Sequence, residues 1–260
     1  MKHLHENTGP ESITWFRRWF DSTYYHKLYS HRTDEEAKNF IDNLLSELHP
    51  APGSSMIDVG CGTGRHSKYL ASQGFQVTGI DLAFSNIKEA QKSQSASLRF
   101  FLHDMRIPFG RQNFDYVFNF FTSFGYFNND DEHTKVVRNM SEALRPGGVL
   151  VLDYINHVYA KTNLVAEESR ELDGITYNIT RWADARHIYK RIAIDDQNMP
   201  RHIEHIERIS NFGLDHFDQM LLANGLEIKG VYGNYNLSTF DDRHSPRLIV
   251  TAFKPKQLRN

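Results

Sequence analysis

The sequence predicts an α/β protein with a doubly wound, mostly parallel sheet and a small antiparallel sheet inserted late in the chain. Between residues 56 and 156, short apolar runs typical of buried strands alternate with helical patterns, which indicates βαβ units. After residue 156 this rhythm stops, and residues 170–210 contain alternating segments with no long helix between them. Such segments are typical of an antiparallel sheet with one covered face.

The N-terminal part contains two helical patterns. Residues 15–29 are rich in aromatic side chains at helical spacing, which predicts one amphipathic helix followed by a turn. Thr33 and Glu36 form a capping box for the next helix, and Pro50 ends it.

The remaining elements follow from apolar runs and turn residues. Strands are expected at 56–60, 75–81, 98–103, 114–121, 149–154, 226–232 and 247–253. Helices are expected from the glycine-rich turn to about Gln73, from Ser85 to about Gln94, and around Leu214–Leu221. A further helix carries Val136 and Leu144 and is capped by Asp130 or Asp131.

These elements divide the chain into four expected parts. They are an N-terminal tail with an aromatic helical lid (1–32), a ligand-binding α/β core (33–156), an antiparallel insertion that covers the substrate (157–212), and a C-terminal completion of the core sheet (213–260).

Composition excludes several classes of protein. The chain of 260 residues carries 30 Lys and Arg against 32 Asp and Glu, and this near balance argues against a nucleic-acid partner. Cys61 is the only cysteine, so no internal disulfide forms and a reducing cytoplasm is the expected location. No apolar run approaches the roughly 18 residues of a membrane span, and the polar N-terminus lacks a signal-peptide pattern.

The strongest motif is a glycine-rich turn between the first strand and its helix. Gly60, Gly62 and Gly64 let the backbone approach a ligand, and the helix offers unpaired N–H groups. The spacing G-x-G-x-G differs from the dinucleotide fingerprint, and no Walker A motif follows. Asp81 closes the second strand, where a carboxylate can accept both hydroxyls of an adenosine ribose, and Asp104 follows the third.

These motifs, taken in order, resemble those of the class I S-adenosylmethionine-dependent methyltransferases. The match consists of D-x-G-x-G-x-G at 58–64, the two acids, and L-R-P-G-G at 144–148, and it covers residues 50–156. The resemblance implies a Rossmann-like sheet of seven strands with an antiparallel last strand, and S-adenosylmethionine as cofactor. It places the following residues around that cofactor: Asp58, Gly60, Cys61, Gly62 and Gly64 at the methionine part, Asp81 and Leu82 at the ribose and adenine, Asp104 and Met105 at the adenine edge, and Asn119 and Phe120 at the methionine amine.

The aromatic segment 114–127 looks like the equivalent stretch of small-molecule N-methyltransferases. In those relatives this loop faces the methyl group, and an N-terminal segment with Tyr and Arg closes over the methionine carboxylate. The matching candidates here are Tyr25, Tyr29 and Arg32, with Tyr24 as another tyrosine that can align.

Methyl transfer prescribes no single catalytic residue, since aligning the nucleophile and excluding water are its main requirements. The candidates for a catalytic role are Tyr126, Asn156 and His157, and those for substrate contact are Ser123, Tyr126, Tyr154, Arg181 and Trp182. No metal is expected, because His202 and His205 lack a third ligand at a suitable spacing.

We therefore expect an enzyme that transfers a methyl group from S-adenosylmethionine to a small molecule by in-line displacement. Two alternatives stay open: a methyltransferase acting on RNA or protein, and a protein that binds the cofactor without catalysis. The sequence also leaves open the acceptor, the atom that is methylated, the use of a general base, and whether the chain forms a homodimer.

Overall fold

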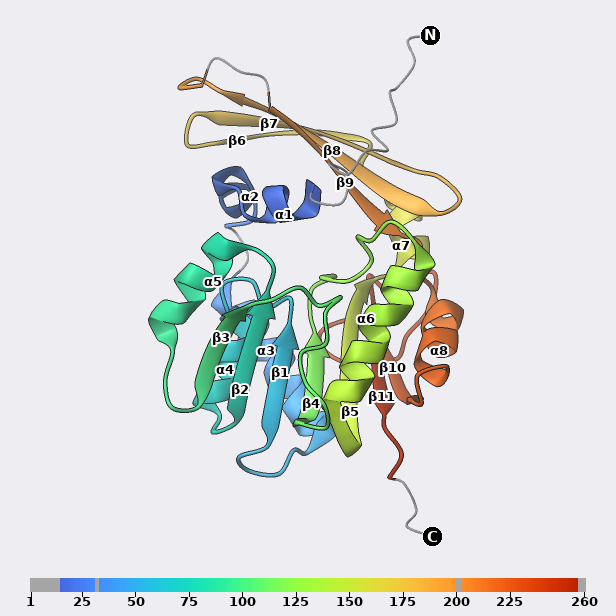
Figure 1. Ribbon diagram of the computed structural model, residues 1–260. Helices are drawn as coiled ribbons and strands as arrows, with labels where there is room; N and C mark the ends of the chain where they lie inside the picture. Colours follow the sequence, from blue (N-terminus) through green and yellow to red (C-terminus); the bar gives the residue numbers. More distant parts are fainter. Residues whose placement is uncertain (1–14, 31–32, 200–202, 257–260) are drawn as a thin grey trace.

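The core of the protein is one sheet of seven strands. The computed structural model describes residues 15–30, 33–199 and 203–256. The strand order is β10-β11-β5-β4-β1-β2-β3, and β11 runs antiparallel to both of its neighbours while β1 to β5 are parallel (Figure 1). The bounds are β1 Ser55–Val59, β2 Gln76–Asp81, β3 Leu98–Leu102, β4 Phe114–Asn119, β5 Leu144–Ile155, β10 Glu227–Tyr232 and β11 Arg247–Phe253. The predicted sheet, with its antiparallel last strand, is confirmed.

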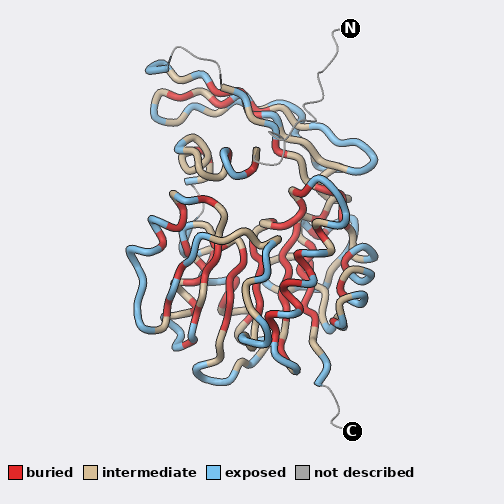
Figure 2. The backbone as a smooth tube through the Cα atoms, in the orientation of Figure 1, coloured by how far each residue is buried: buried red, intermediate tan, exposed pale blue. Residues whose placement is uncertain are grey.

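Helices cover both faces of this sheet, because its strands carry apolar side chains on both. Ile57 and Val117 belong to the apolar cluster that includes α6 and α8, while Met56 and Phe118 belong to the cluster with α3 and α4. Figure 2 shows the buried strands between these layers. The helices of the core are α3 Asp34–Leu48, α4 Arg65–Ser72, α5 Phe84–Ala90, α6 Asp130–Ala143, α7 His157–Thr162 and α8 Leu214–Leu222. None of the described helices has both the length and the apolar character that a bilayer span requires.

A second sheet of four antiparallel strands lies above the carboxyl ends of the core strands (Figure 1). Its strands are β6 Glu167–Leu172, β7 Ile175–Ala183, β8 His187–Asp196 and β9 Ile203–Ser210. Two short helices, α1 Trp15–Phe20 and α2 Thr23–Leu28, lie between this sheet and the core. We call the four strands the lid sheet, and the lid sheet with α1 and α2 the lid.

The lid helices contact both layers. On the lid-sheet side, the Trp19 ring lies 4.5 Å from the ring of His205, and the Tyr24 hydroxyl donates to Asp196 Oδ2 at 3.1 Å. On the core side, the Phe20 ring lies 5.2 Å from that of Tyr126. Side chains of one short segment, most of them aromatic, therefore contact both the lid sheet and the core.

The structure corrects two expectations about helix ends. Residues 15–29 form two helices rather than one, because the Ser22 hydroxyl accepts a hydrogen bond from Tyr25 N at 3.1 Å and caps a new helix. The N-cap of α6 is Asn129, whose Oδ1 accepts from Glu132 N at 2.9 Å. Asp130 and Asp131 instead lie in the first turn, where negative charge favours the helix dipole.

The loop after β4 adopts a conformation that a buried ion pair maintains. Phe121 and Thr122 have φ angles of 60° and 59°, in the left-handed region that side chains with a Cβ rarely adopt. Asp153 Oδ2 accepts from Phe121 N at 2.8 Å, and the Arg247 guanidinium bonds both Asp153 Oδ1 at 2.7 Å and Thr122 Oγ1 at 2.9 Å. The ion pair thus connects β5 and β11 to the loop that leads into the aromatic segment.

We expect Arg247→Met to lower the free energy of unfolding by about 3 kcal/mol, because Asp153 has no exposed side-chain surface and would lose its cationic partner. Arg145→Met is the matched control, since the Arg145–Asp115 pair is 47% and 34% exposed and its loss should cost less than about 1 kcal/mol. Denaturant titration of both variants measures the difference, and equal losses would contradict the structural role of the buried pair.

Candidate active site

The glycine-rich turn joins β1 to α4 and forms one wall of a cavity. Gly60 N and Cys61 N both donate to the carbonyl oxygen of Ile80, at 2.7 and 3.0 Å. A Cβ on Gly60 would lie 2.6 Å from Ser123 Cβ, whereas a Cβ on Gly62 would meet nothing within 4 Å. Glycine at 60 therefore permits close packing against the β4 loop, and glycine at 62 leaves space on the cavity side.

Asp81 lies beside this turn, at the end of β2. Its Oδ2 accepts from Gly62 N at 2.9 Å and its Oδ1 accepts from Ala83 N at 2.8 Å. Burial raises the pKa of Asp81, and these backbone hydrogen bonds oppose the rise. Because a carboxylate has about four acceptor positions, Asp81 keeps capacity for a ligand hydroxyl.

Three of the residues predicted to bind the cofactor contact the strand and helix on either side of the turn and do not face the cavity. Asp58 is 1% exposed and its Oδ2 accepts from Ser67 Oγ at 2.6 Å, while Asn119 Nδ2 donates to the carbonyl oxygen of Val59 at 2.7 Å. Gly64 is the N-cap of α4, and a Cβ there would lie 2.5 Å from the Phe100 ring. None of the three lines the cavity.

The cavity has a volume of about 660 Å³ and lies between the core and the lid. Its core wall includes the predicted residues Gly60, Cys61, Gly62, Asp81, Leu82, Asp104, Met105, Phe120, Ser123 and Tyr126. Its lid wall includes the predicted Tyr25 and Tyr29, together with Phe16, Arg17, Phe20, His26, Ser30 and Glu207. Arg32 lies outside the described residues, as does His202. Among the described residues, no group of three His, Cys, Asp or Glu is placed to hold a metal ion.

Aromatic rings form much of the lid wall. The Phe20 ring lies 5.1 Å from the Tyr25 ring and 5.2 Å from the Tyr126 ring, both in edge-to-face arrangements. The Tyr25 ring lies 4.7 Å from that of Tyr29. These four half-buried residues, Phe20, Tyr25, Tyr29 and Tyr126, form an aromatic wall whose ring faces suit a positively charged group.

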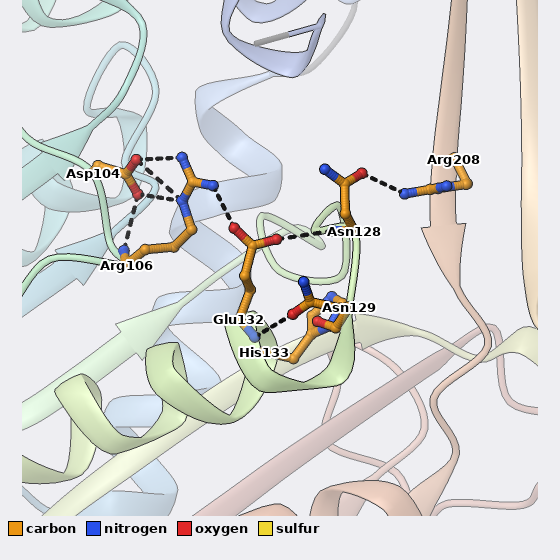
Figure 3. A network of polar contacts seen from close by, with 7 residues as sticks. All are labelled: Asp104, Arg106, Asn128, Asn129, Glu132, His133 and Arg208. Carbon is orange, nitrogen blue, oxygen red and sulfur yellow. Dashed lines mark hydrogen bonds and ion pairs between the residues drawn. The ribbon is translucent and has the colours of Figure 1, made fainter. Parts of the chain in front are cut away.

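Asp104 differs from the expectation that it receives the adenine amino group. Arg106 donates its backbone N–H and its Nε to Asp104 Oδ1, and its Nη2 to Oδ2 at 2.7 Å (Figure 3). Burial alone raises the pKa of Asp104, but these hydrogen bonds lower it overall. Since three N–H donors of Arg106 already use most of the acceptor positions of Asp104, about one position is left for an adenine amino group.

Arg106 also begins a chain of hydrogen bonds that reaches the lid sheet. Its Nη1 donates to Glu132 Oε1 at 2.7 Å, and Glu132 Oε2 accepts from Asn128 N at 3.1 Å (Figure 3). Asn128 Oδ1 then accepts from Arg208 Nη2 on β9 at 2.8 Å. The wall that holds Asp104 is therefore connected through the loop before α6 to the lid.

The structure places three predicted substrate contacts away from the cavity. Arg181 donates to Glu168 Oε2 at 2.6 Å within the lid sheet. Trp182 is 40% exposed and stacks on the Tyr189 ring at 5.1 Å. Tyr154 is buried in the core, where its hydroxyl donates to the carbonyl oxygen of Ser210 at 2.7 Å.

Two predicted catalytic candidates also lie elsewhere. Asn156 Nδ2 donates to the carbonyl oxygens of Asp242 and Ser245, each at 2.8 Å, and its Oδ1 caps α7, so this side chain holds loops together. His157 lines a second, smaller cavity of about 380 Å³ with His187 and His216. Of the catalytic candidates, Tyr126 alone lies at the main cavity. Ser123 also lines it, but its hydroxyl donates to the carbonyl oxygens of Gly60 and Phe120.

Glu207 is a residue that we did not predict from the sequence. It lies on β9 with 6% of its surface exposed, and it lines the cavity. The sequence feature that could have indicated Glu207 is the alternation of side chains along β9. This alternation puts Glu207 on the same face as Ile203 and His205, so an acid lies on the covered face of the strand. The patterns of 170–210 indicated a sheet without telling which face is covered.

Comparisons with known proteins agree with this geometry. Residues 56–148 match a family model described as a methyltransferase domain. The chain is 26% identical to a dTDP-3-amino-3,4,6-trideoxy-α-D-glucopyranose N,N-dimethyltransferase of Streptomyces venezuelae, over 76% of this chain and 85% of that one.

Two solved structures share the fold across nearly the whole chain. An S-adenosylmethionine-dependent methyltransferase from Clostridium acetobutylicum has a TM-score of 0.74 and 17% identity, covering 89% of this chain and 96% of that one. A cofactor-bound amino pentose methyltransferase from Micromonospora echinaspora has a TM-score of 0.65 and 23% identity, covering 90% and 97%.

We expect Gly62→Ala to weaken the binding of S-adenosylhomocysteine at least tenfold, because the added methyl group would occupy the cavity side of the turn. Gly53→Ala is the matched control: both glycines have positive φ, 57° and 74°, and neither Cβ would meet a protein atom within 4 Å. Calorimetric titration should show that the control binds as the wild type does. Similar affinities for the two variants would place the ligand away from the turn.

Asp58 predicts a pH dependence of stability. Burial raises its pKa from an ordinary value of 3.8 to about 7, so the folded protein binds a proton that the unfolded chain releases between these values. The wild type should therefore lose stability relative to Asp58→Asn as the pH rises from 4 to 7, by up to about 4 kcal/mol. Denaturant titrations of both ligand-free proteins at several pH values measure this, and a constant difference would refute the raised pKa.

Proposed function

Because this chain is a class I S-adenosylmethionine-dependent methyltransferase, we propose that it methylates a small molecule held between the cofactor and the lid. The observation that carries the proposal is the cavity itself, whose core wall holds the cofactor motifs and whose opposite wall is formed by α1, α2 and β9.

The residues of the core wall fit the cofactor. Asp81 has acceptor capacity for ribose hydroxyls, and the turn at Gly60 and Gly62 leaves open space for the amino-acid part. S-adenosylmethionine supplies a methyl group on a positively charged sulfur, which is the electrophile of the reaction. The aromatic wall offers ring faces that would attract this charge and apolar surface that would displace water from around it once the ligands are bound.

A small acceptor agrees with the size and charge of the cavity. Its volume of about 660 Å³ lies within the range of small-molecule sites. Its lining contains two arginines and four acids, namely Arg17, Arg65, Asp81, Glu89, Asp104 and Glu207. A site that follows an RNA backbone would need an excess of positive charge. The similarity to an enzyme named for an amino sugar nucleotide supports the same choice.

Incubation with methyl-labelled S-adenosylmethionine and a metabolite extract tests this proposal. We expect label in the low-molecular-weight fraction, and we expect Asp81→Asn to lower cofactor affinity about 10- to 100-fold through weaker charge-assisted hydrogen bonds to the ribose. Asp218→Asn, on the exposed side of α8, is the control and should bind as the wild type does. Label in RNA or protein, or in no fraction, would overturn the proposed acceptor class.

A further inference from the structure

Glu207 is the one described residue of the lid sheet that lines the cavity. It lies opposite Lys190 in the pairing of β8 with β9 and comes from the wall facing the glycine turn. Asp81 and the glycine-rich turn, which fit the ribose and the amino-acid part of the cofactor, belong to the core wall, whereas Tyr25 and Tyr29, which the resemblance assigns to its carboxylate, lie on the lid wall. A ligand group that contacts Glu207 is therefore on the lid side of the cavity, away from Asp81 and the turn.

The Glu207 carboxylate is held in a fixed position. Its Oε1 accepts from Trp19 Nε1 on α1 at 2.6 Å and from the Tyr29 hydroxyl at 3.2 Å, and its Oε2 lies 3.5 Å from the same hydroxyl. Tyr29 is itself contacted by Lys190, whose Nζ lies 4.6 Å from the ring centroid and also bonds the hydroxyl. Neutral donors from α1 and the end of α2 thus orient the carboxylate, and both of these donor residues are aromatic.

The surroundings of Glu207 favour a positively charged partner. A carboxylate with 6% exposure is costly unless a cation or several donors compensate it; the donors to Glu207 are the neutral Trp19 and Tyr29, while the Lys190 ammonium donates to the Tyr29 hydroxyl. The aromatic wall of Phe20, Tyr25, Tyr29 and Tyr126 adjoins it, and ring faces attract cations. An acid beside several aromatic rings is the chemistry that recognises an ammonium group, whereas a neutral hydroxyl needs only a hydrogen-bond acceptor.

We propose that Glu207 binds the amino group of the acceptor, so that this enzyme methylates nitrogen of a basic amine. This inference rests on the proposed function and adds to it the class of acceptor and the residue that selects it.

The proton balance assigns a definite task to Glu207. The acceptor enters as an ammonium ion and gives one proton to the carboxylate, which frees the nitrogen lone pair. The nitrogen attacks the methyl carbon, the N–C bond forms, and the S–C bond breaks with its electron pair staying on sulfur. The product leaves as a methylated ammonium ion, and Glu207 returns its proton to water. No other base and no redox partner is required.

A pair of variants on β9 tests the assignment. Glu207→Gln keeps the shape of the side chain and an oxygen for Trp19 Nε1, but it removes the charge. Glu204→Gln is the matched control, because Glu204 is an exposed acid of the same strand that pairs with Arg191 at 2.6 Å. The amine pool, obtained from a metabolite extract by reversible capture on an amine-reactive resin, serves as acceptor mixture, with the uncaptured part as comparison.

The proposal expects label from methyl-labelled S-adenosylmethionine in the amine pool. With the labelled amine purified from that pool as acceptor, Glu207→Gln should raise KM about 10- to 100-fold and also lower kcat, because the amide can neither pair with the ammonium group nor accept its proton. Its affinity for S-adenosylhomocysteine should equal that of the wild type, and Glu204→Gln should change none of these quantities.

Three results would overturn it. Label confined to the uncaptured part would exclude a basic amine, and this measurement on the wild type does not depend on how the variant folds. An unchanged KM in Glu207→Gln would show that the carboxylate does not bind the acceptor. An equal loss of S-adenosylhomocysteine affinity would assign Glu207 to the cofactor. Label in RNA or protein would instead refute the proposed function on which the inference rests.

Discussion

The carbonyl oxygen of Ile80 accepts hydrogen bonds from both Gly60 and Cys61, and the geometry of the cavity depends on this contact. It draws the turn after β1 over the end of β2, so that Asp81 and Gly62 come within hydrogen-bond distance. Ser123 completes the arrangement from the other side by donating to the carbonyl oxygen of Gly60. Backbone groups that would otherwise need water are thereby paired inside the protein, while the cavity side of Gly62 stays open.

The lid is the second component of the site, and it is held to the core mainly by aromatic contacts. Edge-to-face pairs such as Phe20–Tyr126 and Phe16–Phe127 join α1 to the segment after β4. Polar contacts join α1 and α2 to the lid sheet through Glu207 and Asp196. The aromatic side chains of residues 15–29 and 114–127 therefore meet where the lid and the core enclose the cavity.

The sequence predicted those parts of the site that depend on neighbouring residues. Gly60, Gly62 and Asp81 follow from a strand, a turn and a strand within residues 56–81, and local spacing determines how they meet. Glu207 could not be predicted in the same way, because its contact with Trp19 joins residues 188 positions apart. Trp182 was instead predicted to contact the substrate because it is an aromatic residue of the insertion. The alternation of side chains along β7 puts it on the exposed face, where it stacks on Tyr189. The ion pair between Arg106 and Asp104 was not predicted, because nothing in the position of Arg106 in the sequence indicates that it bonds this carboxylate.

The buried pair of Asp153 and Arg247 has a consequence for how the chain can evolve. Each residue supports the left-handed backbone at Phe121 and Thr122, and either one alone would leave a charge without its partner. A protein in which one of these two residues has been replaced is therefore less stable than its parent, and replacing both together avoids the unpaired charge. Positions 153 and 247, which lie 94 residues apart, should change together among descendants of this sequence and stay fixed otherwise. The lid wall of the cavity lies outside this pair, so its residues can be replaced one at a time without the constraint that the pair places on positions 153 and 247.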